Sequence, residues 1–389
     1  MREPVLVPRL RPFTSTIFAE MTALAQRTGA VNLGQGFPDT DGPASMLAAA
    51  QQAIADGLNQ YPPGPGRPEL RAAIAQHRSR YGTDYDPDTE ILVTVGATEA
   101  ITAALLGLVE AGDEVIVIEP YYDSYAAAVA MAGATRRVVG LREDDTGRLG
   151  LDLAALRAAI TPATRAILLN SPHNPTGTVF TRDELAGIAA LCVEHDLIAI
   201  TDEVYEHLTF DDAVHIPLVT LPGMAERTVS ISSAGKTFNC TGWKIGWACG
   251  PADLIAAVRA AKQFITFVGG APFQPAVAQA LRTELDWVGH LRTALQGKRD
   301  RLVAGLTEAG FAVRPSFGTY FVCADVRPLG FADGAELCWA LPERIGVAAV
   351  PVQVFTDHPD SWRHLVRFAF CKRDEVLDEA VRRLRELRP

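Results

Sequence analysis

The middle of the chain alternates between short apolar runs and longer segments with helical spacing. The runs are rich in β-branched residues and predict buried strands, at 90–95, 113–118, 136–139, 166–169, 197–201, 228–232 and 245–249. Helices are predicted between them at 98–109, 124–131, 153–160, 181–192 and 252–267. This alternation predicts an α/β fold with a doubly wound, mostly parallel sheet of about seven strands and helices on both faces.

Both ends of the chain follow a different pattern. Apolar positions three to four apart between residues 13 and 24 predict a helix after a proline-rich start. Beyond a glycine-rich break at 268–272, we expect helices at 275–285 and 290–309 and strands near 319–324 and 365–370. The predicted parts are an N-terminal arm (1–27), a large domain (46–285) and a smaller α+β domain made of 28–45 and 286–389.

Composition narrows the classes of partner. The 389 residues are 48% hydrophobic and 21% charged, as in a soluble globular protein, and carry a net charge of −10. That acidity disfavours nucleic acid and anionic membranes as partners, and no apolar run approaches the roughly 18 residues of a spanning helix. The six cysteines are scattered without a CxxC pair, so we expect neither a metal nor disulfides and place the protein in the cytoplasm.

Two lysines stand out at the end of one predicted strand. The run 228–232 stops at small residues just before Lys236, and Lys244 follows inside a second apolar run. A turn there would put Lys236 at the carboxyl end of a strand, where open α/β sheets bind ligands. One lysine for an imine and another for a phosphate suit pyridoxal phosphate (PLP) chemistry. A Walker A loop is one alternative, but Ser230 stands where that motif needs glycine. An ordinary surface lysine in a loop is the other, and the rest of the chain must decide.

Two glycine-containing segments are candidates for close contact with a ligand. Gly96, Ala97 and Thr98 end a strand and open a helix, so free N–H groups, the helix dipole and a hydroxyl could bind an anion, although a simple helix cap would look the same. Gly34 and Gly36 lack the third glycine of a dinucleotide fingerprint. They instead allow the backbone to approach a ligand closely.

Polar residues follow three further apolar strands. Asn174 is presented by a turn with two prolines, beside His173, which we take as a bystander. Asp202 lies at the end of a predicted buried strand, where its charge needs a cation or hydrogen-bond donors. A protonated pyridine nitrogen would be such a cation, and Tyr205 could then bond the phenolic oxygen of the same ring. Arg367 lies in an apolar strand and must meet a carboxylate, either structural or from a substrate.

Together these residues resemble a known family. Asn174-Pro175-x-Gly177, Asp202-x-x-Tyr205, Ser233-x-x-Lys236 and Arg367 have the order and spacing of class I aminotransferases of fold type I, over nearly the whole chain. Segments 32–39, 235–238 and 241–244 resemble the kynurenine, glutamine and methionine aminotransferase branch. Segments 59–66, 119–125 and 240–250 are most similar to actinobacterial N-succinyldiaminopimelate aminotransferases.

The resemblance implies a role for each site residue. Lys236 would bond PLP and move the substrate proton, Asp202 would keep the pyridine nitrogen protonated, and Tyr205 and Asn174 would bond the ring oxygen. Tyr122 would stack on the ring. The implied phosphate ligands are Ala97, Thr98, Ser233, Lys244 and, from a neighbouring subunit, Tyr61. The implied substrate contacts are Arg367, Gly36 and Asn174 for the α-carboxylate and Phe18 for the side chain. Lys244 departs from the arginine frequent in the wider family.

The implied activity is that of a cytosolic, homodimeric PLP aminotransferase that uses glutamate and 2-oxoglutarate. Its favoured substrate would be N-succinyl-L,L-diaminopimelate, in lysine and diaminopimelate biosynthesis. The alternatives are a broad kynurenine, glutamine or methionine aminotransferase and a PLP-dependent C–S β-lyase, which shares the cofactor residues. The effector domain of a transcription regulator is disfavoured by the acidic charge and by the roughly 30 residues ahead of Gly34, too few for a DNA-binding domain.

Overall fold

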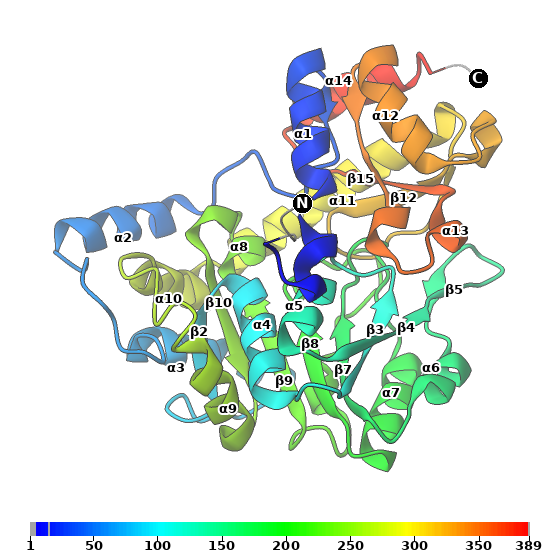
Figure 1. The fold of residues 1–389 in the computed structure, drawn as a ribbon. Coiled ribbons are helices and arrows are strands. Elements are labelled where there is room, and N and C mark those ends of the chain that lie inside the picture. The colour runs from blue at the N-terminus through cyan, green and yellow to red at the C-terminus, as the bar shows by residue number, and fades with distance from the viewer. Residues whose placement is uncertain (1–4, 15, 388–389) are drawn as a thin grey trace.

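A computed structural model of the chain describes residues 5–14 and 16–387, so residues 1–4 and 15 of the predicted arm lie outside the described residues. Figure 1 shows a large α/β part below a smaller part that holds the C-terminal end, with the N-terminal end between the two. The central sheet has seven strands in the order β2-β10-β9-β8-β7-β3-β4. Only β10 runs antiparallel to its neighbours, which confirms the mostly parallel sheet. The strands are β2 (Ile91–Val95), β3 (Glu114–Glu119), β4 (Thr135–Gly140), β7 (Thr164–Asn170), β8 (Ile198–Asp202), β9 (Thr228–Ser233) and β10 (Ile245–Cys249).

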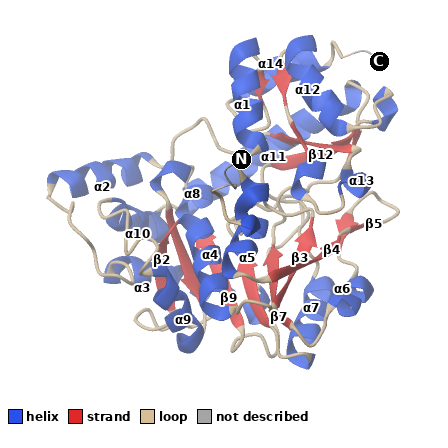
Figure 2. Ribbon diagram, in the orientation of Figure 1, coloured by secondary structure: helices blue, strands red, loops and turns tan. Residues whose placement is uncertain are grey.

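Helices cover both faces of this sheet, as its alternating apolar side chains require (Figure 2). Val115 and Val117 of β3 pack in one core cluster, whereas Ile116 and Ile118 pack in another on the opposite face. The first face is covered by α4 (Gly96–Leu108), α5 (Ser124–Ala132) and α9 (Ala252–Lys262). The second is covered by α2 (Ala44–Ala55), α3 (Pro68–Arg78), α6 (Leu153–Ala159), α7 (Arg182–Glu194) and α10 (Phe273–Thr283).

The smaller part is built around a second sheet. Its antiparallel strands follow the order β11 (Ala312–Val313), β12 (Phe321–Asp325), β15 (Leu365–Ala369) and β14 (Val350–Pro351). Around it lie α1 (Ile17–Thr28), α11 (Leu285–Glu308), α12 (Gly334–Arg344) and α14 (Asp374–Leu384). The strand β1 (Val31–Asn32) pairs with β13 (Val347–Ala348), which ties the N-terminal segment to this part. The exact domain bounds stay a prediction.

The remaining elements are short. They are α8 (Ala234–Thr237), α13 (Pro359–Trp362), β5 (Arg142–Glu143), β6 (Leu149–Gly150) and 3-10 helices at Pro8–Phe13, Ser79–Tyr81, Leu218–Thr220, Thr241–Trp243, Arg327–Leu329 and Val352–Phe355. Among the described helices, none is both long and apolar enough to cross a bilayer.

Three local predictions were wrong in detail. Lys236 lies in the one-turn helix α8 rather than in a plain turn, because the Phe238 amide donates to the Ala234 carbonyl. The helix predicted for 252–267 ends at Lys262, whose ammonium donates to the carbonyl of Phe267. The helix predicted to begin at residue 290 begins at Leu285. The capping box at Thr181 and Glu184 is confirmed.

Candidate active site

A cavity of about 360 Å³ opens at the carboxyl ends of the central strands, beneath the smaller sheet. Parallel strands bring their carboxyl ends to one edge, so residues far apart in sequence meet there. The structure brings together all but one of the predicted site residues along this cavity: Phe18, Gly36, Ala97, Thr98, Tyr122, Asn174, Asp202, Tyr205, Ser233, Lys236, Lys244 and Arg367. Tyr61 alone does not line it.

Lys236 extends from α8 into the cavity. Its Nζ donates to the hydroxyl of Tyr320 across 2.8 Å and lies 3.5 Å from the carbonyl oxygen of Gly36. Burial disfavours the ammonium form and lowers the pKa of Lys236 to about 8. An amine with this pKa keeps a sizeable neutral fraction near physiological pH, and the neutral form can act as a nucleophile and as a base.

Asp202 ends β8 and faces the same cavity. The hydroxyl of Tyr125 donates to its Oδ2 at 2.5 Å and the amide of Val204 donates to its Oδ1 at 3.3 Å. Burial outweighs these bonds and raises the pKa of Asp202 to about 6. A carboxyl group that is costly to ionise without a cation is a partner for a protonated ring nitrogen.

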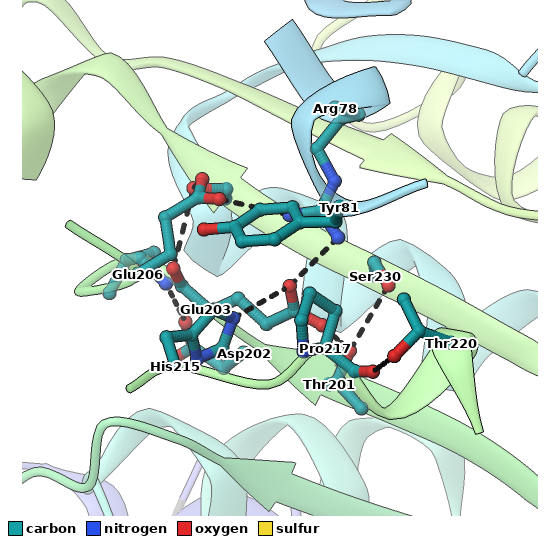
Figure 3. A network of polar contacts seen from close by, with 12 residues as sticks. Arg78, Tyr81, Thr201, Asp202, Glu203, Glu206, His215, Pro217, Thr220 and Ser230 are labelled. Atoms are coloured by element: carbon teal, nitrogen blue, oxygen red, sulfur yellow. Dashed lines mark hydrogen bonds and ion pairs between the residues drawn. The ribbon is translucent and has the colours of Figure 1, made fainter. Parts of the chain in front are cut away.

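A buried ionic network holds the turn that carries Asp202 and Tyr205 (Figure 3). Glu203 and Glu206 alternate with them in sequence but do not line the cavity. Their carboxylates instead form ion pairs with the buried guanidinium of Arg78, at 2.9 and 3.0 Å. The side chains of strand residues complete the network: Thr201 donates to Glu203 and Ser232 donates to Glu206. The network therefore anchors the back of the segment whose front faces the cavity.

The N-terminus of α4 forms an anion pocket together with Lys244. Gly96 has φ +75°, and a Cβ there would stand 3.0 Å from Nζ of Lys244. A Cβ on Gly246 would lie 2.6 Å from the backbone carbon of Gly96, so β10 and the start of α4 touch at backbone level. Free helix N–H groups, the Thr98 and Ser233 hydroxyls and the Lys244 ammonium converge on one end of the cavity. That donor set fits a phosphate.

Arg367 also lines the cavity and is fully buried. Its guanidinium donates to Oδ1 of Asn174 and to the carbonyl of Gly34, each at 2.9 Å, and stacks 4.0 Å over the ring of Phe321. Within the described residues its Nε has no hydrogen-bond partner. Of the two partners expected for Arg367, a carboxylate of the protein is therefore not the one bonded to it in the described part of the chain. A substrate carboxylate remains. A buried cation with only neutral acceptors is prepared for an anionic ligand.

Helix α1 and residues 34–36 lie beside Arg367 and contribute to the lining of the cavity. The Phe18 ring lies 5.3 Å from the Arg367 guanidinium, and Gln35 donates to the Phe18 carbonyl at 3.2 Å. A Cβ on Gly36 would lie 2.3 Å from the ring of Phe321, so only glycine allows this close approach.

The two remaining predicted tyrosines differ in position. Tyr122 lines the cavity and packs edge-on against Tyr125 at 5.7 Å. Tyr61 is 81% exposed and contacts Phe267 at the surface. The contribution of Tyr61 to a neighbouring subunit's site stays a prediction.

Several residues of the site escaped sequence reasoning. Asn170 ends β7 and accepts from the Asn174 amide at 2.7 Å, and its position four residues before Asn174 could have revealed it. Gln35 and Phe321 line the cavity, and Tyr125 and Tyr320 bond two residues that line it. None of the four carries a local signal, because tertiary packing brings them there. His173 bonds Thr176 at 2.8 Å and does not line the cavity, as predicted for a bystander.

The fold and the site define a class of enzyme. The chain belongs to the class I and II aminotransferase family, which it matches over residues 28–384, and is thus a transaminase of fold type I. It is 65% identical over 387 residues to the probable N-succinyldiaminopimelate aminotransferase DapC of Mycobacterium tuberculosis, with 97% of each chain covered. It is 40% identical to the methionine aminotransferase of Escherichia coli, with 98% of this chain and 99% of the relative covered. The solved structure of N-succinyldiaminopimelate aminotransferase from M. tuberculosis superposes with a TM-score of 0.97 at 66% identity, covering 98% of this chain and all of that one.

Proposed function

We propose that the protein is a PLP-dependent aminotransferase acting on N-succinyl-L,L-diaminopimelate, with glutamate and 2-oxoglutarate as the second substrate pair. The observation that carries the reaction is one cavity holding a buried lysine, a buried aspartate and an anion pocket. The substrate assignment rests on the 65% identity to the M. tuberculosis relative, against 40% to the methionine aminotransferase.

The residues of the cavity fit PLP. The pocket formed by Ala97, Thr98, Ser233 and Lys244 would hold the phosphate. Asp202 would pair with the ring nitrogen, while Asn174 and Tyr205 would donate to the ring oxygen. The Oδ1 of Asn174 accepts from Arg367, which leaves its NH₂ group free to donate. When bound, PLP supplies the electron sink that makes the substrate Cα acidic.

The chain's own residues would bind the amino acid and move one proton. Arg367 would clamp the α-carboxylate, and its Nε, which has no hydrogen-bond partner among the described residues, would be an additional donor beside the Gly36 backbone. Lys236 Nζ would take the proton from the Cα of the amino donor. In the second half of the exchange it would give a proton to the Cα of the amino acid that forms. A pKa of about 8 lets the amine exchange protons near physiological pH. Phe18 would shield the reacting atoms from water.

The lysine assignment has a direct test. Wild-type protein supplied with PLP should absorb at roughly 410–430 nm through a bond to Lys236. Lys236→Ala should lose both that band and turnover. Retention of the band and of full turnover by this variant would contradict the assignment.

Substrate choice is tested by kcat/KM with 2-oxoglutarate as acceptor. N-succinyl-diaminopimelate should be preferred over kynurenine, glutamine and methionine by more than about tenfold, on the order of 1.4 kcal/mol. A smaller preference would favour the broad aminotransferase, which the E. coli relative supports. Release of ammonia and a 2-oxo acid from a thioether amino acid without 2-oxoglutarate would indicate a C–S β-lyase.

We further propose a cytoplasmic homodimer with shared sites. Tyr61, Phe264 and Phe267 are exposed by 81%, 86% and 48%, which makes an apolar surface that a second subunit would cover. The six cysteines, all buried and unpaired, are compatible with a reducing compartment.

Mixed dimers test the sharing. In a hybrid of Lys236→Ala and Tyr61→Ala chains, the site with an intact lysine would receive Tyr61 from its partner. Unfolding and refolding the two weak variants together should therefore restore activity above that of either alone. No gain would mean that Tyr61 serves no partner site.

A further inference from the structure

Tyr320 contacts the amine on which the proposed reaction depends. It lies just before β12 in the smaller part, and its hydroxyl oxygen stands 2.8 Å from Nζ of Lys236. The same hydroxyl donates to the carbonyl oxygen of Gly36. These two hydrogen bonds thus join three segments: helix α8 of the large part, residues 34–36 and the smaller sheet.

The direction of the two hydrogen bonds follows from their chemistry. The carbonyl of Gly36 can only accept, so the phenolic hydrogen points there. A lone pair of the Tyr320 oxygen is then left for an N–H of Lys236. Burial raises the pKa of the Tyr320 phenol well above its usual value, so it remains protonated and cannot act as the base itself.

The backbone holds Tyr320 in this position. Thr319 adopts φ +66°, a left-handed conformation that a β-branched residue rarely takes. It is held there because its amide donates to Leu208 at 2.9 Å and its Oγ1 accepts from the Phe321 amide at 3.0 Å. The carbonyl of Tyr320 accepts from Phe370 at 2.9 Å, and its ring packs edge-on against Tyr205 at 5.2 Å. Strain retained in this way is typical of functional sites.

We propose that Tyr320 is a further catalytic residue, which holds the free amine of Lys236 and stabilises its ammonium form while it carries the substrate proton. The inference rests on the proposed function. In the proton transfer, the Cα–H bond breaks, an N–H bond forms on Nζ, and the electron pair stays with the substrate and its electron sink. Tyr320 accepts a hydrogen bond throughout and neither gains nor loses a proton.

Tyr320→Phe tests this role, because it keeps the ring and removes only the oxygen. We expect kcat to fall about tenfold or more, with KM changed less than about threefold. The kinetic isotope effect of Cα-deuterated substrate should rise, because proton transfer becomes more rate-limiting. Tyr85→Phe is the matched control: Tyr85 is also a buried tyrosine, but among the described residues its hydroxyl bonds no residue that lines the cavity, so its variant should keep wild-type kcat and isotope effect.

A second readout needs no turnover. In full-length protein freed of cofactor, the rate at which added PLP is trapped on Lys236 by borohydride depends on the neutral amine. Because removing an acceptor destabilises the ammonium, the pH midpoint of trapping should fall by about half a unit or more in Tyr320→Phe. Wild-type kcat, isotope effect and midpoint in this variant would overturn the inference and leave the proposed function intact. Wild-type protein without the PLP band would instead contradict the proposed function.

Discussion

Arg367 donates to Oδ1 of Asn174 across 2.9 Å, and this bond joins the smaller sheet to the loop after β7. The contact orients both partners. It occupies the oxygen of Asn174, so that the NH₂ group remains available as a donor, and it holds a guanidinium whose Nε has no hydrogen-bond partner in the described part of the chain. A single hydrogen bond therefore couples the proposed cofactor contact to the proposed carboxylate clamp.

Arg367→Lys should weaken amino-acid binding far more than cofactor binding. A lysine cannot form the planar bidentate clamp, so kcat/KM for amino-acid substrates should fall by about 30-fold or more, or at least 2 kcal/mol. The absorbance of bound PLP should be unchanged. Arg385→Lys, at an exposed ion pair with Glu308, is the control and should retain kcat/KM.

Asn174→Asp provides the converse test. A carboxylate introduced beside Arg367 would occupy the cation that the substrate needs, so KM should rise even though the arginine is retained. An unchanged KM in both Arg367→Lys and Asn174→Asp would exclude Arg367 as the carboxylate site.

Asp202→Asn should stabilise the cofactor-free protein at neutral pH. The folded pKa of Asp202 is about 6 against an ordinary value of 3.8, so the folded chain binds more protons than the unfolded chain between these values. Stability is therefore lost as pH rises through this window, by about 3 kcal/mol in total. Asparagine avoids that cost. Denaturant unfolding should show the gain at pH 8 and little of it near pH 4.

The same substitution should impair the loaded enzyme, because a neutral amide cannot keep the ring nitrogen protonated. Opposite effects on stability and turnover would distinguish a functional carboxylate from a structural one. A loss of stability at pH 8 in cofactor-free Asp202→Asn would contradict the prediction.

Arg78→Met should destabilise the fold, because it leaves Glu203 and Glu206 buried without their shared cation. Breaking a buried pair of this kind costs about 3–5 kcal/mol. The exposed pair of Arg157 and Glu194 offers a matched control, and Arg157→Met should cost less than about 1 kcal/mol. Equal effects in urea titrations would show that the network does not stabilise the fold.

The effect of Arg78→Met should depend on pH. Burial opposes ionisation of Glu203, but Arg78 and His215 outweigh it and lower its pKa to about 2. The pair therefore contributes its full stability above the ordinary carboxyl pKa of 4.5, and that stability is lost as pH falls toward 2. The difference between wild type and Arg78→Met should shrink over that range.

Lys244→Met should weaken cofactor binding selectively. Loss of a charge-assisted bond to phosphate should raise the dissociation constant of PLP about 10- to 100-fold, or 1.4–2.7 kcal/mol. At saturating PLP the KM for amino acids should change less than about twofold, because Lys244 lies at the phosphate end of the cavity. A wild-type dissociation constant would remove Lys244 from the phosphate site.

Local patterns were enough to predict the strands that position the site. Apolar runs of β-branched residues predict β8, β9 and β10 within one residue, because burial on both faces selects such runs. Residues that directly follow those strands, such as Asp202 and Lys236, could be predicted as neighbours for the same reason: the carboxyl ends of parallel strands meet at one edge.

The sequence by itself therefore determined the fold class, the family and the side of the sheet that carries the chemistry. Only the tertiary structure decided which residues complete the site. Phe321 lines the cavity, and Tyr320 and Tyr125 bond Lys236 and Asp202, through the packing of separate elements that no local spacing records. That the hydrogen-bond acceptors of Arg367 in the described part of the chain are an amide and a backbone carbonyl, with Nε unbonded there, was equally beyond sequence reasoning, because it depends on every element that packs around the guanidinium.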